Sequence, residues 1–243
     1  ALSERLVNLR NLEEKKASVL ATIEEQGKLT DELKKQIEAV MTMVALEDLY
    51  RPYRPKRRTR ATIAKEKGLE PLAEILRAQA TTRTIEEEAT AFVDAEKGVE
   101  SVQDAIDGAK DILAEVYADD ADYRTKLRAM TKESGSLVAK AKDEEADSVY
   151  EMYYDFSEPI KKLVGHRILA INRGEAEKFL TVKIEAPRQE ILLWLVKQII
   201  GNMKHDSASY LYEAITDSYD RLIAPSIERE IRNELTEKAE EGA

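Results

Sequence analysis

Apolar residues recur along most of the chain at steps of three and four positions, with charged residues between them. This spacing is typical of amphipathic helices. The first run predicts a helix that ends near Gly27, and Thr30 predicts the N-cap of a second helix that extends towards Leu46. Helical periodicity resumes at Ile63, and further helices are predicted over about 85–95, 99–118 and 122–133.

Two short segments differ from this helical pattern. Residues 135–139 are apolar and begin at a glycine, and residues 179–185 alternate apolar and polar side chains. We expect these two segments to be strands that pair with each other. Ser157 to Pro159 resembles a helix N-cap with proline in the first turn. The predicted fold class is therefore mainly α, an irregular multi-helix scaffold with a small two-stranded β element.

The last forty residues carry an apolar stripe with an unusually long period. Its members recur at steps of four: Leu211, Ile215, Tyr219, Ile223, Ile227, Ile231 and Leu235. Because this step exceeds the 3.6 residues of an α-helical turn, the stripe must wind around a straight helix. Pro225 predicts a break or kink within it.

Composition limits the compartment and the chemistry. The 243 residues include no cysteine, which excludes disulfides and thiolate zinc sites and agrees with a reducing compartment. The longest apolar run, centred on 191–196, is too short to span a membrane, and no signal peptide is recognisable. The expected location is cytoplasmic, with no membrane partner. Because the chain begins without methionine, we expect it to be a fragment of a longer protein.

Charge is distributed unevenly. The formal net charge is −10, but the stretch Arg51–Arg60, here called the basic connector, holds six cations and no acid. The remaining 233 residues have 32 cations against 48 acids, a net charge of −16. Pro52 and Pro55 disfavour helix in the residues before them, so we expect an extended connector over about 50–58.

Two interpretations of the basic connector remain open. In a polyproline II strand, Tyr50 and Tyr53 would share one edge, and arginines would occupy another. Arginine and lysine neutralise phosphates and tyrosine stacks on unpaired bases, which predicts nucleic-acid contacts. The candidate residues are Arg51, Tyr53, Arg54, Lys56, Arg57, Arg58 and Arg60. Alternatively, the connector straps helices together, with its tyrosines in the core and its cations paired with acids.

Candidate catalytic chemistry is sparse. His166 and His205 lie far apart, and the sequence has no phosphate-binding glycine loop and no nucleophile motif. Asp119, Asp120 and Asp122 could be read as a metal-dependent hydrolase site, but helix capping is the commoner role of such a cluster. We therefore expect no enzyme activity, no cofactor and no metal site.

Five sequence blocks together resemble one known family. They are Leu46–Arg60, Ala61–Leu72, Phe92–Val99, His166–Glu175 and Ala224–Ile231, and they span nearly the whole chain. These blocks closely resemble the Tex family of bacterial transcription accessory proteins. The resemblance implies a cytoplasmic, multidomain nucleic-acid-binding protein with a helical N-terminal region, an RNase H-like domain, helix-hairpin-helix elements and a C-terminal S1 domain as the main RNA contact.

The resemblance also implies what this chain represents. Residues 1–243 are similar to the helical N-terminal region with its first helices missing, and we expect sub-parts at 1–60, 61–147 and 148–243. The chain would then bind nucleic acid, RNA or DNA, weakly on its own. The leading hypothesis is a non-catalytic scaffold that contributes a basic strip to nucleic-acid binding. The alternative is a protein-interaction scaffold that docks on the transcription machinery, with a purely structural connector.

Overall fold

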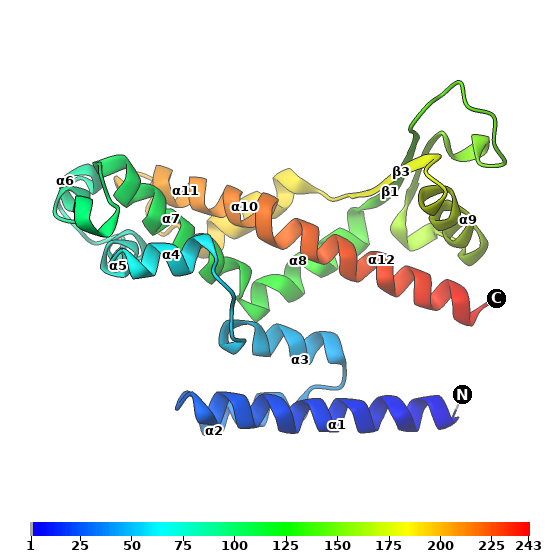
Figure 1. The fold of residues 1–243 in the computed structure, drawn as a ribbon, viewed down its shortest axis with the longest axis horizontal. Coiled ribbons are helices and arrows are strands. Elements are labelled where there is room, and N and C mark those ends of the chain that lie inside the picture. The colour runs from blue at the N-terminus through cyan, green and yellow to red at the C-terminus, as the bar shows by residue number, and fades with distance from the viewer. Residues whose placement is uncertain (1) are drawn as a thin grey trace. The chain divides into compact units, whose positions relative to one another are not determined.

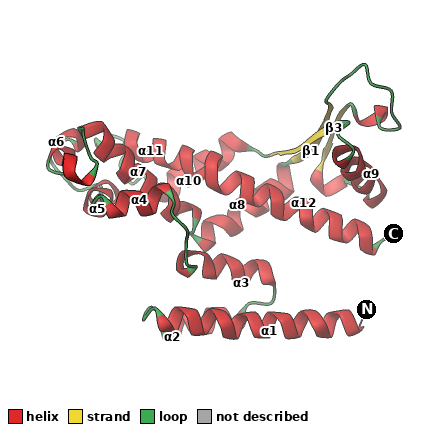
Figure 2. Ribbon diagram, in the orientation of Figure 1, coloured by secondary structure: helices red, strands yellow, loops and turns green. Residues whose placement is uncertain are grey.

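The computed structural model describes residues 2–243 and is mainly α-helical, with one small antiparallel sheet (Figure 2). The helices are α1 (Leu2–Glu25), α2 (Asp31–Ala39), α3 (Met43–Tyr50), α4 (Arg60–Glu66), α5 (Glu70–Ala78), α6 (Ile85–Thr90), α7 (Val102–Ala118), α8 (Ala121–Ser134), α9 (Gly165–Ala176), α10 (Arg188–Ile199), α11 (Ser207–Asp217) and α12 (Ala224–Glu241). The strands are β1 (Ser136–Ala141), β2 (Asp155–Pro159) and β3 (Leu180–Glu185). The predicted fold class is confirmed in its main feature, the dominance of helix.

The chain divides into two compact units. Unit 1 contains the residues up to Leu76 together with Thr82–Thr125, and unit 2 contains Arg77–Thr81 together with Lys126–Ala243. The finer sub-parts 1–60, 61–147 and 148–243 stay a prediction. Within residues 2–243, no helix is long and apolar enough to cross a membrane.

In unit 1, the first three helices share an apolar core, built from Leu12, Val19, Ile23, Leu33, Ile37 and Leu46. Thr30 caps α2 as predicted, because its hydroxyl accepts a hydrogen bond of 3.1 Å from the Leu33 N–H. The expectation of one helix from Thr30 to Leu46 is wrong. Thr42 accepts from the Ala45 N–H and so caps a separate helix, α3 (Figure 1).

In unit 2, the sheet has the strand order β2-β1-β3, with both pairs antiparallel. The predicted pairing of the two apolar segments is confirmed, since Leu137 lies opposite Ile184. The two-stranded expectation is wrong, because Ser157 to Pro159 belong to a third strand rather than to a helix start. Pro159 lacks an N–H, but it ends an edge strand, where proline is tolerated.

The long-period stripe passes through a π-helical segment, Ser218–Ile223, that joins α11 to α12. A π-helix bonds residue i to residue i+5, so its turns are wider than α-helical turns. This widening accommodates part of the four-residue step and keeps Tyr219, Ile223 and Ile227 buried. Pro225 follows directly in the first turn of α12, close to the predicted break.

Candidate nucleic-acid interface

The basic connector is helical at its start and extended only afterwards. Helix α3 runs to Tyr50 and continues as a 3-10 turn over Arg51–Tyr53, where the Arg54 N–H donates to the carbonyls of Tyr50 (3.0 Å) and Arg51 (3.4 Å). Arg51 is helical (φ −46°, ψ −48°) although proline follows it. Extended backbone begins at Arg54, so the expected polyproline conformation is wrong for the first part of the connector.

The two tyrosines of this region pack against the core of unit 1. Tyr50 and Tyr53 are partly buried against the cluster formed by α1–α3. The Tyr53 carbonyl accepts a 2.6 Å hydrogen bond from Gln26 Nε2, and Lys15 Nζ lies 5.6 Å from the Tyr50 ring centre. The rings therefore fasten the connector to the first helices instead of standing free beside the arginines.

Lys56 is also a fastening residue. Its ammonium group lies 2.9 Å from Glu115 Oε1 and forms a second ion pair with Asp119. Thr59 Oγ1 donates a 2.9 Å hydrogen bond to the other oxygen of Glu115. Both carboxylates belong to the C-terminal end of α7, where a helix favours positive charge. The Lys56 side chain is 25% exposed, so most of it is covered.

The aspartates that follow α7 have structural partners. Burial raises the pKa of the Asp119 carboxyl, while the hydrogen bond and charge of Lys56 act to lower it. Arg51, which is half-buried, also lowers this pKa through its charge. Asp120 caps α8 by accepting a 2.9 Å hydrogen bond from the Tyr123 N–H.

The other four connector cations face solvent. Arg54 lies 3.6 Å from Glu47 with its side chain 41% exposed. Arg58 lies 3.6 Å from Glu66 with its side chain 71% exposed. Arg57 and Arg60 are exposed and form no ion pair with any residue in 2–243. Exposed pairs contribute about 0–1 kcal/mol, so Arg54 and Arg58 remain available to an outside anion.

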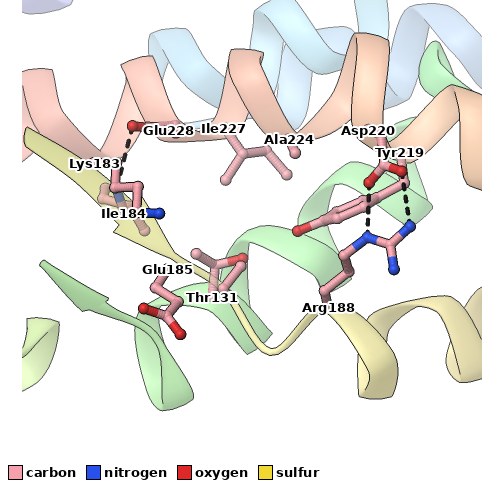
Figure 3. Close-up of a pocket in the computed structure, with 11 residues that line it drawn as sticks. Thr131, Lys183, Ile184, Glu185, Arg188, Tyr219, Asp220, Ala224, Ile227 and Glu228 are labelled. Carbon is pink, nitrogen blue, oxygen red and sulfur yellow. Dashed lines mark hydrogen bonds and ion pairs between the residues drawn. The ribbon is translucent and has the colours of Figure 1, made fainter. Parts of the chain in front are cut away.

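A concave site lies in unit 2 and is here called the Tyr219 pocket. Its volume is about 450 Å³. Its walls come from α8, β3, the start of α10, the π-helical segment and α12 (Figure 3). The lining residues are Thr131, Lys183, Ile184, Glu185, Ala186, Arg188, Tyr219, Asp220, Ala224, Ile227 and Glu228.

The sequence does not predict this pocket, because its pattern shows Tyr219 only as one member of an apolar stripe. Arg188 holds Asp220 through two hydrogen bonds, 2.9 Å from Nε and 2.8 Å from Nη2. The Ile184 N–H donates a 3.2 Å hydrogen bond to Glu228 Oε1. Burial, followed by the negative charge of Asp220, raises the pKa of Tyr219 to about 12.

Comparison with known proteins places this fold in a family. A family model described as Tex central region-like matches residues 80–243. The "Uncharacterized protein YdcI" of Bacillus subtilis (strain 168) is 46% identical over 245 residues, which cover 100% of this chain and 34% of that protein.

Two further relatives have functional names. The "Transcriptional accessory protein Tex" of Neisseria gonorrhoeae is 37% identical over 250 residues, covering 100% of this chain and 32% of that protein. The human "S1 RNA-binding domain-containing protein 1" is 30% identical over 254 residues, covering 98% of this chain and 25% of that protein. The chain thus spans about a third or less of the length of these relatives. Their similarity over its whole length, with the matching family model, shows that the chain belongs to the Tex family of transcription accessory proteins.

Proposed function

We propose that this chain is a non-catalytic, cytoplasmic helical module of a Tex-like protein, and that its basic connector contributes contacts to the phosphate backbone of nucleic acid. One observation carries the proposal: Arg57, Arg58 and Arg60 are displayed to solvent at the end of a segment that is otherwise fastened down. Arg54 extends this group at a more covered position.

The contact we propose is to phosphates rather than to bases. The tyrosine rings that could stack on bases are packed against the core of unit 1. Guanidinium groups bind phosphate oxygens without reading the sequence. The connector should therefore bind RNA and DNA backbones with little sequence preference.

Binding by this chain alone should be weak. Outside the connector the net charge is −16, which repels a polyanion at long range. The name of the human relative includes an S1 RNA-binding domain, and we propose that the full-length protein has its main RNA contact in such a domain. The connector would then add affinity and orientation to a strand that is held elsewhere.

The non-catalytic part of the proposal rests on the aspartates that follow α7. Asp119 is engaged by Lys56, and Asp120 caps α8. These carboxylates are used to hold the fold together. If these carboxylates instead formed a metal-dependent hydrolase site, the chain would show turnover that requires a divalent cation and that Asp119→Asn abolishes.

A second function is favoured by a different observation. The fastening of the connector by Lys56, Thr59 and the tyrosines is what a purely structural strap requires. In that case the chain is a scaffold for protein partners in transcription, and the exposed arginines only help to keep the protein soluble.

Fluorescence anisotropy with labelled single-stranded RNA and duplex DNA separates these two functions. The test variant is Arg57→Ala/Arg58→Ala/Arg60→Ala. The matched control is Arg10→Ala/Lys34→Ala/Lys35→Ala, which removes three exposed cations from α1 and α2 of the same unit. We expect the test variant to bind both probes more weakly. Its salt slope should fall by about 2.7 for duplex DNA and about 2.1 for single-stranded RNA, whereas the control variant should leave affinity and slope nearly unchanged. Equal losses in the two variants would favour the scaffold.

A further inference from the structure

The Tyr219 pocket contains a phenol hydroxyl that has no protein partner, at the tip of an otherwise buried side chain. Tyr219 is 3% exposed, and its hydroxyl makes no hydrogen bond to any residue in 2–243. Figure 3 shows this hydroxyl at the tip of a ring that reaches into the pocket. The hydroxyl oxygen itself reaches the open pocket, so its O–H is available to water or to a ligand. A ligand atom that enters the pocket can therefore accept this hydrogen bond in place of water.

The wall that holds Tyr219 is itself unusual. Tyr219 and Asp220 belong to the π-helical segment Ser218–Ile223. Such segments are rare and occur frequently at functional sites. The phenol of Tyr219 reaches from this segment into the pocket (Figure 3).

The middle of the pocket is apolar. Ala224 and Ile227 of α12 form one wall, and the hydroxyl-bearing Thr131 of α8 lies across from them (Figure 3). A ligand body that lies here replaces water against aliphatic carbon, which is favourable in proportion to the area covered. An apolar lining with a few fixed polar groups is typical of small-molecule sites.

The charges around the pocket favour a neutral ligand over an anionic one. Arg188 is neutralised by its two hydrogen bonds to Asp220. Glu228 uses Oε1 to accept from the Ile184 N–H, which leaves Oε2 without a partner in the described chain. The lining holds two cations against three carboxylates, a net charge of −1. Lys183 is a lining cation without an ion pair in the described chain, but the net charge disfavours a phosphate, whereas a neutral N–H donor could bond to Glu228.

We propose that the Tyr219 pocket binds a neutral planar heterocycle that carries both a hydrogen-bond acceptor and an N–H donor, the chemistry of a nucleobase. The acceptor receives the Tyr219 O–H, the ring lies over Ala224 and Ile227, and the N–H donates to Glu228 Oε2. A side-chain amide has the same polar groups but lacks the apolar body that this pocket covers. This site goes beyond the proposed function, because it lies in unit 2 and needs neither the connector nor a phosphate.

The test is an NMR titration of the intact chain with guanosine, adenosine, cytidine and uridine as probes, observed at the methyl groups of Ile184 and Ile227. We expect saturable shifts of these methyl groups with at least one nucleoside. Tyr219→Phe keeps the ring but removes the donor, so affinity should fall about tenfold. Tyr212→Phe, on an exposed tyrosine of α11 that does not line the pocket, should leave affinity unchanged.

A further variant and two further ligands test whether the shifts come from binding in the pocket. Ala224→Leu fills the pocket from α12 and should abolish the shifts while the chain stays folded. A nucleoside 5′-monophosphate should bind no better than its nucleoside, and a single-stranded oligonucleotide that displaces the nucleoside would show that the base comes from a strand.

The proposal is overturned by absence of saturable methyl shifts with all four nucleosides, by equal affinity in Tyr219→Phe, or by binding that requires the phosphate. Repeating the titration with the Arg57→Ala/Arg58→Ala/Arg60→Ala variant separates this site from the connector. Nucleoside binding should persist in that variant whether or not the connector binds nucleic acid.

Discussion

Lys56 and Arg57 are neighbours in one basic stretch, yet the structure uses them differently. Lys56 is partly covered, with its side chain 25% exposed, and is paired with Glu115 and Asp119, which lie 59 and 63 residues further along the chain. Arg57 is exposed and has no ion-pair partner within residues 2–243. A run of cations is therefore not one functional unit. Whether each cation is paired or exposed depends on residues that are remote in sequence.

A third kind of cation in unit 1 extends the comparison. Arg124 of α8 is paired with Asp48 of α3 at 3.6 Å, with the two side chains 1% and 4% exposed. Its Nη1 also donates a 3.0 Å hydrogen bond to the Ala118 carbonyl. Positive charge in this unit is therefore buried at Arg124, partly covered at Lys56 and displayed at Arg57.

The largest effect is expected at the buried pair. Arg124→Met removes the cation and leaves Asp48 as a buried carboxylate without that partner. We expect the free energy of unfolding to fall by about 3–5 kcal/mol. Urea denaturation followed by circular dichroism measures this loss.

The control for this prediction is the double variant Arg124→Met/Asp48→Leu. Replacing both charges with apolar side chains also removes the buried carboxylate, so much of the lost stability should return. A loss below about 1 kcal/mol in Arg124→Met would show that burial does not distinguish this cation from the connector cations.

The next largest effect separates the fastened lysine from a displayed arginine. Lys56→Ala breaks two ion pairs that are partly covered, so we expect a loss of about 1 kcal/mol in the free energy of unfolding. Arg58→Ala changes an exposed side chain and should cost less than about 0.5 kcal/mol. The same urea experiment measures both, and equal losses would contradict the distinction.

The smallest effect concerns proton binding by Asp119. Burial already raises the pKa of this carboxyl above 3.8, and Lys56 holds it down, so Lys56→Ala should raise the pKa further. Between 3.8 and the raised pKa, the folded chain binds more protons than the unfolded chain. This group therefore makes the free energy of unfolding fall as pH rises through that window, and the fall should be larger in Lys56→Ala.

Carbon-13 NMR of the Asp119 carboxyl, titrated in both proteins, measures the shift directly. Asp155 offers a control of opposite sign, because Lys140 lowers its pKa and Lys56→Ala should leave it unchanged. An unchanged pKa at Asp119 would mean that the ion pair between Lys56 and this carboxylate does not form in solution.

Much of the helical fold could be predicted from the sequence, because it depends on local patterns. Thr30 was recognisable as a cap, and the pairing of 135–139 with 179–185 followed from two apolar segments in a helical chain. Strand β2 was not predictable in this way. Its ladder is set by β1, while Ser157 and Pro159 locally favour a helix start.

The candidate site was predictable in composition but not in geometry. Pro52 locally disfavours helix at Arg51, yet Tyr50 and Tyr53 pack on α1–α3 and the chain continues as a 3-10 turn. No local signal marks Lys56 as paired, since Glu115 and Asp119 are remote in sequence. The Tyr219 pocket was hidden for the same reason: its walls come together only in the folded chain.

The most direct test of the account compares Lys56→Ala with Arg57→Ala, two variants that each remove one positive charge from adjacent positions. Binding to duplex DNA is measured over a range of salt concentrations, and the slope of log K against log salt is compared with that of the unmodified chain. If Arg57 contacts a phosphate and Lys56 is held by α7, Arg57→Ala lowers the slope by about 0.9 and Lys56→Ala leaves it unchanged. Equal slopes in the two variants, or a larger change for Lys56→Ala, would contradict the division of the basic connector into fastened and displayed cations.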